Sequence, residues 1–335
     1  MKYSDLDFNN KKVLITGGAG FIGSNIAIYL QKHFPKCNIV VFDLFRSGKK
    51  FNNGNLISFG HYNNLIDFKG KIISGDINSK YDLAQIEKYK FDYIFHQAAV
   101  SDTRAEEQDY IIKTNVNSFY EILKISAQTN AKLIYASSAA TYGNCPSPQT
   151  VGNESPDNTY GFSKLMMDNV ASDFISNNPE CHVVGLRYFN VYGPREFYKN
   201  TTASTIIQFG HQILSGNNPK LFENSDQIFR DFIYVKDVIQ ANIKACSCSK
   251  SGVYNVGTGI KRSFQEVSDI LQKTFNTQYK TDYIENPYSG YQSDTCANIQ
   301  ETKQKLGFQP YWSLEKGILD YSDEILSIYE KNIKK

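Results

Sequence analysis

The sequence predicts an α/β protein built on a doubly wound, parallel β-sheet. Stretches with the apolar spacing of a helix, such as 111–128, lie between most of its short apolar runs. Continuous apolar strands separated by helices indicate a parallel sheet that helices cover on both faces. The predicted strands, which are rich in β-branched and aromatic residues, are 13–16, 39–43, 71–77, 93–99, 132–138 and 182–191.

The composition and charge of the chain exclude several classes of protein. Its 335 residues are 41% hydrophobic and 21% charged, and the net charge of +2 gives no reason to expect nucleic-acid binding, which requires a strongly basic face. No run of about 18 apolar residues could span a bilayer, and the opening MKYSDLDFNNKK lacks the apolar centre of a signal peptide. Six scattered cysteines without zinc-ligand spacing predict reduced thiols, no metal site and a soluble, cytoplasmic protein.

The pattern of the chain changes after residue 190, where turns and shorter elements dominate. RDFIYVKDV at 230–238 and GVYNVGTG at 252–259 look like returns to the sheet domain. Residues 44–70, rich in Asn, Gly and Phe, look irregular, and the sequence leaves the role of the segment as a whole open. We therefore expect a larger sheet domain formed by 1–187 and 232–259, interleaved with a smaller α/β domain formed by 188–231 and 260–335.

A glycine-rich loop joins the first predicted strand to the first predicted helix. GGAGFIG places Gly17, Gly20 and Gly23 there, and such a turn lets the backbone approach a pyrophosphate at the positive end of a helix dipole. Asp43 ends the next strand, 20 residues after Gly23, where a carboxylate can bind ribose hydroxyls. A glycine pattern alone is weak evidence. Strand, loop, helix, strand and acid in this order predict a Rossmann-type dinucleotide-binding domain.

The residues around Asp43 leave the choice between NAD and NADP open. Asp43 by itself favours NAD, because its charge repels a 2′-phosphate. Arg46, Lys49 and Lys50 follow at once, and a cationic group at this place can accommodate that phosphate. An exposed basic loop explains the same three residues equally well. We expect NADP, with NAD as the alternative.

The motif YGFSK places a tyrosine and a lysine one helical turn apart. Tyr160 and Lys164 then share a helix face, while Ser138 lies at the end of a strand, at the edge where parallel sheets bind ligands. A Tyr160 phenolate could take a hydroxyl proton while a hydride leaves the same carbon for a nicotinamide, and Ser138 could hold the substrate oxygen. A lysine cation about 4 Å away is worth about 4 kcal/mol at an effective dielectric of 20, which would lower the tyrosine pKa by about three units at most.

Five motifs in order resemble the extended short-chain dehydrogenases/reductases that act on nucleotide sugars: GGAGFIG, SSAATYG, YGFSK, RYFNVYGPRE and RDFIYVKDV. The resemblance covers nearly the whole chain. It implies that Asp76 meets the adenine, that residues 96–99 line the cofactor and that Asn115 supports the site, whereas His96 taken alone is a typical core histidine. The residues that it assigns to the cofactor are Gly17, Gly20, Phe21, Ile22, Gly23, Asp43, Leu44, Lys50, Asp76, Gln97, Ala98, Ala99, Val100, Ser101, Asn115, Lys164 and Val191.

Two features of the sequence indicate which branch of this family the chain resembles. Sugar-nucleotide 4,6-dehydratases carry an Asp-Glu pair after the active-site hydroxyl residue, but Ala139 and Ala140 stand here, so elimination of water is poorly supported. UDP-galactose-type 4-epimerases do not carry PREFYK followed by TTAS after the NVYG-like turn. YFNVYGPREFYKNTTAS at 188–204 and KLFENSDQIFRDFIYV at 220–235 are similar to a branch that inverts C6″ of an ADP-linked heptose for the lipopolysaccharide core.

This similarity implies that Lys199 is a second acid–base group, on the far side of the sugar from Tyr160. The enzyme would oxidise C6″ with bound NADP, let the intermediate reorient and return the hydride to the other face. Arg230 suits the substrate pyrophosphate, because its planar fork can bind two oxygens at once. The implied substrate contacts are Asn190, Thr201 (in place of a serine), Gln208 (in place of a histidine), Phe222, Glu223, Asn224, Ser225, Arg230 and Tyr291.

Three alternatives stay open from the sequence. Another sugar-nucleotide 4-epimerase or 4-dehydrogenase would use the same serine, tyrosine and lysine. A non-catalytic dinucleotide sensor would use the same fold, but the presence of both Tyr160 and Lys164 counts against it. Without the resemblance, Lys199 would be an ordinary exposed turn lysine. The family further implies a ring-shaped homo-oligomer such as a pentamer.

Overall fold

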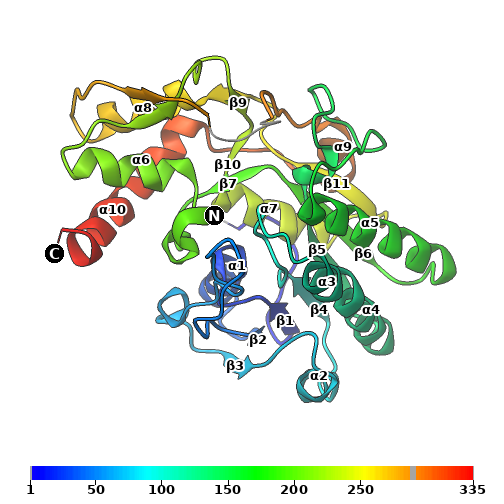
Figure 1. Cartoon of the computed structure of the whole chain (residues 1–335). Helices are drawn as coiled ribbons and strands as arrows, with labels where there is room; N and C mark the ends of the chain where they lie inside the picture. The colour runs from blue at the N-terminus through cyan, green and yellow to red at the C-terminus, as the bar shows by residue number, and fades with distance from the viewer. Residues whose placement is uncertain (1, 287–291, 335) are drawn as a thin grey trace.

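The largest element of the fold is a seven-stranded sheet with the order β11-β6-β5-β4-β1-β2-β3 (Figure 1). The structure is a computed structural model and describes residues 2–286 and 292–334. Every neighbouring pair of these strands is parallel, which confirms the predicted Rossmann-type α/β fold. The strands are β1 (Lys12–Thr16), β2 (Asn38–Asp43), β3 (Lys71–Ser74), β4 (Tyr93–His96), β5 (Lys132–Ser138), β6 (Val183–Tyr188) and β11 (Gly252–Val256).

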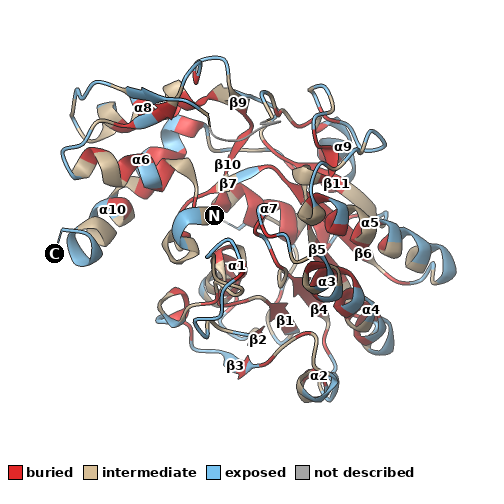
Figure 2. Ribbon diagram, viewed as in Figure 1, coloured by how far each residue is buried: buried red, intermediate tan, exposed pale blue. Residues whose placement is uncertain are grey.

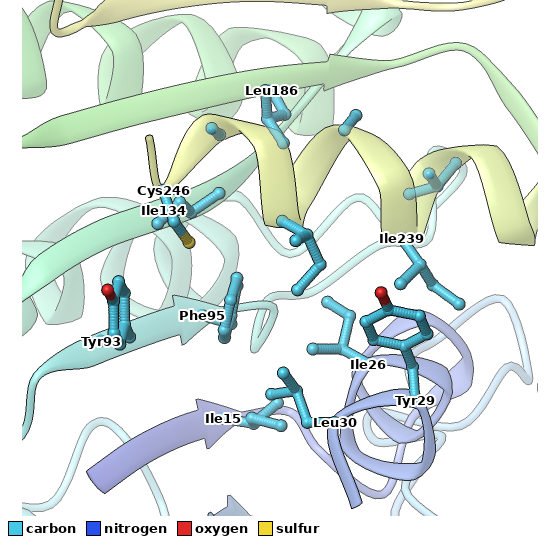
Figure 3. Packing of buried hydrophobic residues seen from close by; sticks show 14 of the residues in the cluster. Ile15, Ile26, Tyr29, Leu30, Tyr93, Phe95, Ile134, Leu186, Ile239 and Cys246 are labelled. Carbon is cyan, nitrogen blue, oxygen red and sulfur yellow. The ribbon is translucent and has the colours of Figure 1, made fainter. Parts of the chain in front are cut away.

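Helices cover both faces of this sheet. α1 (Phe21–His33) and α7 (Val235–Ala245) lie on one face, where Figure 3 shows Ile26, Leu30 and Ile239 packing toward strand residues such as Ile15 and Leu186. On the other face, α2 (Lys80–Glu87), α4 (Ser118–Thr129) and α5 (Thr159–Asn177) share a second buried core, and α3 (Gln108–Ile112) contacts α5.

Side chains of a single strand divide between these two faces. In β1, Val13 and Ile15 belong to the core under α1, while Leu14 belongs to the core under α2 and α4. Successive residues of a strand point to opposite faces, so a strand buried on both faces must be apolar throughout. This explains why the predicted strands are continuous apolar runs.

Several predicted elements have different limits in the structure. The runs at 71–77 and 93–99 end as strands at Ser74 and His96, because their last residues turn into loops at the sheet edge. The predicted helix 111–128 is one continuous helical rod made of α3, a π-helical turn η2 (Lys113–Asn117) and α4.

The run at 182–191 is two strands and not one. Phe189 separates β6 from β7 (Asn190–Tyr192), and its N–H donates to the Val256 carbonyl at 3.0 Å. Beyond this point the chain leaves the main sheet, and β7 pairs with β10 (Phe232–Tyr234). Residues 230–238 contain the end of β9 (Phe229–Arg230), β10 and the start of α7, and α7 packs on the main sheet.

A second group of elements lies beside the carboxyl edge of the sheet, at the upper left of Figure 1. Helices α6, α8 and α10 share a separate buried core, and Figure 2 shows buried residues on the sides that face one another. The domain limits at 187, 231 and 259 stay a prediction. The remaining elements are η1 (Tyr62–Leu65), η3 (Ala139–Tyr142), η4 (Phe197–Thr202), α6 (Thr205–Leu214), β8 (Lys220–Phe222), β9 (Phe229–Arg230), β12 (Arg262–Ser263), α8 (Phe264–Thr274), β13 (Asp282–Ile284), α9 (Gln300–Leu306) and α10 (Leu314–Asn332).

The strand order places a crevice above β1. This strand has β2 on one side and β4 on the other, so the loops that leave β1 and β4 diverge at the carboxyl edge. Ligands of open parallel sheets bind at such a point. Within the two described ranges, no helix has both the length and the apolar character needed to cross a membrane.

Candidate active site

A cavity of about 560 Å³ opens at this carboxyl edge. Its walls come from the loops that follow β1 to β5 and from the segment between β7 and α6, so residues far apart in the sequence face one space. The predicted site residues that line it are Gly17, Gly20, Phe21, Ile22, Gly23, Asp43, Leu44, Asp76, Gln97, Ala98, Ala99, Val100, Ser101, Ser138, Tyr160, Lys164, Asn190, Val191, Lys199, Thr201 and Arg230.

The remaining predicted site residues lie elsewhere. Lys50 is exposed, Asn115 is buried behind the cavity wall, and the Gln208 side-chain amide donates to the Ala203 carbonyl at 2.7 Å. Phe222 ends β8, Glu223, Asn224 and Ser225 follow it, and none of these four residues lines the cavity. Tyr291 lies outside the described residues. The roles of all these residues stay predictions.

The glycine-rich loop forms a floor without side chains. Gly17 has a φ of +67°, and a Cβ there would lie 2.6 Å from the Ala98 nitrogen, while a Cβ on Gly23 would lie 2.3 Å from the Gly17 oxygen. Gly20 is the N-cap of α1, so the free N–H groups of the first turn point toward the cavity. This arrangement fits the pyrophosphate of a dinucleotide.

Asp43 ends β2 in the wall of the cavity. Its Oδ2 accepts from the Ala19 N–H at 2.9 Å and its Oδ1 accepts from the Phe45 N–H at 2.8 Å. Burial raises the pKa of Asp43, and these backbone hydrogen bonds oppose that rise. The carboxylate therefore joins the glycine loop to the segment that follows β2, besides facing the site where a ribose would lie.

The three cations expected near a 2′-phosphate lie away from the cavity lining. Lys49 and Lys50 are exposed. The Arg46 guanidinium donates to the Tyr198 carbonyl and is held 5.7 Å from the centre of the Tyr198 ring. In this conformation Arg46 contacts the turn that carries Lys199.

Tyr160 and Lys164 come from the first two turns of α5, and Ser138 ends the neighbouring β5. Lys164 is buried, and its Nζ donates to the Ala136 carbonyl at 2.7 Å. Burial lowers the Lys164 pKa to about 8, and the Asp168 carboxylate acts in the opposite direction. The Tyr160 pKa is raised by burial, and a hydrogen bond with Ser138 opposes that rise.

The direction of the Tyr160 pKa differs from the sequence argument, which expected a lysine about 4 Å away to lower it. The Lys164 Nζ lies 6.0 Å from the centre of the Tyr160 ring and is directed toward a backbone carbonyl. Desolvation of the phenol is therefore the larger effect. A positive nicotinamide ring, when bound, would act on the phenol in the same direction as the lysine.

Lys199 lies in η4 and is half-buried at the cavity wall. Its Nζ is 5.8 Å from the centre of the Phe21 ring. Burial lowers the Lys199 pKa, and the carboxylates of Glu196 and Asp102 oppose that effect. Glu196 is itself fully buried and accepts from Gly193 N, Ser204 N and Ser204 Oγ. Lys199 is therefore not an ordinary exposed turn lysine.

Asn115 is buried behind the cavity wall. Its side chain exchanges hydrogen bonds with the Val100 N–H and carbonyl, and its amide donates to Ser163 Oγ at 2.8 Å. It lies in the π-helical turn, a feature often found near functional sites. Asn115 thus fixes the loop after β4 relative to the helix that carries Tyr160 and Lys164.

His96 is a core histidine, as its sequence context alone indicated. It is buried, lies 2.7 Å from Thr16 Oγ1 through Nδ1, and stacks on Phe119. Burial lowers its pKa to about 3, and the Lys164 charge adds to this effect. Across residues 2–286 and 292–334, no three His, Cys, Asp or Glu side chains are grouped in a way that could hold a metal ion.

Sequence reasoning missed several residues of the cavity wall. Residues 57–60, Asp102 and Phe264 line the cavity, together with 202–205 at the start of α6. Residues 202–204 end the stretch 188–204 that carries the similarity, but the other residues lie in no recognisable motif. For 57–60, the available signal was their position in the irregular segment after Asp43.

A Rossmann-type sheet, a glycine floor and a tyrosine–lysine pair around one cavity define an enzyme that works with a bound dinucleotide. Residues 13–257 match the NAD dependent epimerase/dehydratase family, so the chain belongs to this family. Its cofactor is a nicotinamide dinucleotide, and it is an isomerase of the epimerase type.

Solved structures give more detail on this membership. The chain is similar to the ADP-L-glycero-D-manno-heptose-6-epimerase of Helicobacter pylori, with 48% identity, a TM-score of 0.90, and 98% of this chain and 100% of that chain covered. The UDP-N-acetylglucosamine 4-epimerase of Methanobrevibacter ruminantium is 27% identical, with a TM-score of 0.84 and coverage of 95% and 99%. The UDP-glucose 4-epimerase of Thermotoga maritima is 25% identical, with a TM-score of 0.84 and coverage of 94% and 99%.

Proposed function

We propose that the chain converts ADP-D-glycero-D-manno-heptose to ADP-L-glycero-D-manno-heptose by inverting C6″, for the lipopolysaccharide core. The observation that carries this proposal is that Tyr160 and Lys199 line one cavity with the glycine floor. The similarity to the Helicobacter pylori heptose epimerase over the full chain supports the choice of sugar.

The proposed mechanism needs a proton acceptor and donor for each orientation of the sugar. A nicotinamide held above the glycine floor would supply the hydride acceptor and donor for C6″. Tyr160, hydrogen-bonded with Ser138, exchanges the hydroxyl proton in one orientation. Lys199, whose pKa is lowered by burial, exchanges it in the other, since a lysine that titrates closer to neutral pH can both accept and donate a proton.

Other residues would bind and orient the substrate. Arg230 is buried at the cavity wall, and its guanidinium already donates to the Phe229 and Gln292 carbonyls, which fixes the orientation of its plane. A guanidinium held in this way suits a pyrophosphate. Asn190 and Thr201 line the same cavity and would contact the sugar.

The finer parts of the proposal are the cofactor, the compartment and the assembly. We propose NADP as the retained cofactor, and Arg46, Lys49 and Lys50, which do not line the cavity in this structure, follow Asp43 closely in the sequence. All six cysteines are free thiols, which suits a reducing cytoplasm. A homo-oligomer such as a pentamer is the expected assembly.

The test is to incubate purified protein with ADP-D-glycero-D-manno-heptose and to follow the configuration at C6″ by NMR. Inversion without added cofactor would support the proposal, because an epimerisation involves no net redox change. A parallel panel of UDP-sugars tests the second candidate, a 4-epimerase, which the two UDP-sugar epimerase neighbours favour. Turnover of a UDP-sugar with no change in the heptose would overturn the proposal.

A further inference from the structure

The segment that follows β2 lies between the glycine loop and the turn that carries Lys199. Its residues 57–60 line the cavity beside Asp43, and the Arg46 N–H donates to the Gly60 carbonyl at 2.9 Å. A Cβ on Gly60 would lie 2.1 Å from Asp43 Oδ1, so the segment packs directly on the predicted ribose-binding acid.

The outer side of this segment forms a socket for one aromatic side chain, Tyr198. The His61 ring stacks on the Tyr198 ring with centres 3.8 Å apart and planes at 4°. The Asn63 amide donates to the Tyr198 hydroxyl at 2.6 Å. Arg46 donates to the Tyr198 carbonyl. Three residues of one segment thus hold both the side chain and the backbone of the residue before Lys199.

The same segment is fixed to the glycine loop. The His61 N–H and the Asn64 amide both donate to the Ala19 carbonyl, each at 3.0 Å. The Ala19 N–H in turn donates to Asp43. The socket for Tyr198 therefore has a defined position relative to the floor of the cavity.

A second connection reaches the other end of the Lys199 turn. The Thr201 hydroxyl donates to Asn55 Oδ1 at 2.8 Å, and the Asn55 amide donates to Asp102 Oδ2 at 2.7 Å. Asp102 is buried and also accepts from the Asn53 amide at 2.9 Å. Contacts from the segment therefore lie on both sides of Lys199 in the sequence.

The Lys199 turn needs such support because its own structure is short and irregular. η4 is a six-residue 3₁₀ segment broken at Asn200, whose φ of +53° and ψ of −125° are rarely adopted by a residue with a side chain. Backbone of this kind persists where its surroundings hold it in place.

We propose that residues 45–66 are a positioning device for Lys199, with Tyr198 as the anchor that docks in the socket of Arg46, His61 and Asn63. Tyr198 does not line the cavity, so it is a positioning residue and not a catalytic one. Because 57–60 also form the wall beside Asp43, the device links the ribose end of the cofactor site to the placement of the lysine. This inference takes one point from the proposed function, which is the catalytic role of Lys199.

The first experiment needs no sugar and so is independent of the proposed function. Competitive labelling of the full chain with trace acetic anhydride across a pH series, quantified by mass spectrometry, reports the pKa of Lys199. In the native protein the groups facing Lys199 are the Glu196 and Asp102 carboxylates and the Phe21 ring, and burial dominates. Tyr198→Ala should free the turn and raise the Lys199 pKa toward its ordinary value. An unchanged labelling profile would overturn the proposal.

Milder variants keep the test decisive if Tyr198→Ala does not fold. Tyr198→Phe and Asn63→Ala each remove one end of a single hydrogen bond and should shift the Lys199 labelling in the same direction by a smaller amount. Tyr81→Ala is the matched control, because Tyr81 is 84% exposed on α2, and its labelling profile should equal the native one. No shift in any of the folded socket variants contradicts the proposal.

Kinetics with the heptose substrate then separates positioning from general stability. A displacement of about 1 Å of a catalytic group costs up to about 100-fold, so Tyr198→Ala should lower kcat by about 10- to 100-fold with little change in KM. The double variant Tyr198→Ala, Lys199→Met should be no slower than Lys199→Met alone, since Tyr198 acts through Lys199. Additive losses in this cycle would contradict the proposal. If the native protein does not turn over the heptose, the proposed function fails, and the labelling alone decides on the device.

Discussion

Tyr160 and Lys199 are the two residues on which the proposed inversion depends. Tyr160→Phe deletes a hydroxyl and Lys199→Met deletes a charge while most of the side-chain volume stays. A positioned acid or base contributes about 10²–10⁴-fold, so each variant should lose epimerase activity on that scale. The NMR assay of C6″ measures the loss, and thermal unfolding should show that both variants fold. Lys124→Met, at a lysine that is 61% exposed, is the control and should keep native activity. If Lys199→Met is as active as this control, Lys199 is only a turn residue.

His96 should make the stability of the protein sensitive to acid. Its pKa is about 3 in the folded protein, and the unfolded value is near 6.5. Between these two values the unfolded state binds a proton that the folded state does not, so stability is lost as the pH falls below 6.5. At pH 5 the loss should be about 2 kcal/mol relative to pH 7. Urea unfolding of the native protein and of His96→Gln at both pH values measures it. An equal pH dependence in the two proteins would contradict a buried, neutral His96.

At the scale of elements, a buried charge network joins α5 to β5 and β6. The Asp168 carboxylate accepts from Tyr135 at 2.8 Å, from Ser137 at 2.9 Å and from Arg187 Nε at 2.9 Å. Arg187 also pairs with Glu154. Since Tyr160 and Lys164 precede Asp168 on the same helix, this network fixes the helix against the strand that ends in Ser138.

Removing the charge of Asp168 should therefore destabilise the protein strongly. Asp168→Asn leaves the Arg187 cation buried with one carboxylate fewer, and breaking a buried ion pair typically costs about 3–5 kcal/mol. Urea unfolding measures the change. The matched control is Glu121→Gln, which breaks a surface pair with Lys124 and should cost less than about 1 kcal/mol. Equal costs for the two variants would show that the buried network contributes no more than a surface pair.

For the whole molecule, the cavity predicts that cofactor binding stabilises the fold. Its walls include Gly17 and Asp43 from the sheet and Arg230 and Phe264 from the other group of elements, so a bound ligand contacts both. A ligand at 100 times its Kd stabilises the folded state by about 2.7 kcal/mol. Nucleotide-free protein should show a higher Tm with NADP and, at equal concentration, a smaller rise with NAD. The absence of any rise with NADP, together with one for NAD, would assign NAD as the cofactor.

Much of the fold could be predicted because it depends on local patterns. The apolar runs of β1, β2 and β5 and the helical spacing after them follow from burial on both faces of a parallel sheet, and the structure has them at nearly the predicted residues. The limits of β6 and β7 could not be predicted. At Phe189 the chain changes its pairing partner from β11 to β10, and both of these strands are distant from it in the sequence.

By itself, the sequence determined the glycine floor, the acid after β2 and the tyrosine–lysine pair. Each of these features consists of residues that lie close together in the chain, so a short motif is enough to predict it. Only the tertiary structure decided that Lys199 is half-buried with a lowered pKa, that Lys164 is directed toward Ala136, and that residues 45–66 surround Tyr198. The physical reason is that burial and electrostatic fields depend on neighbours in space. Such neighbours come from strands and loops far apart in the sequence, and no local pattern specifies them.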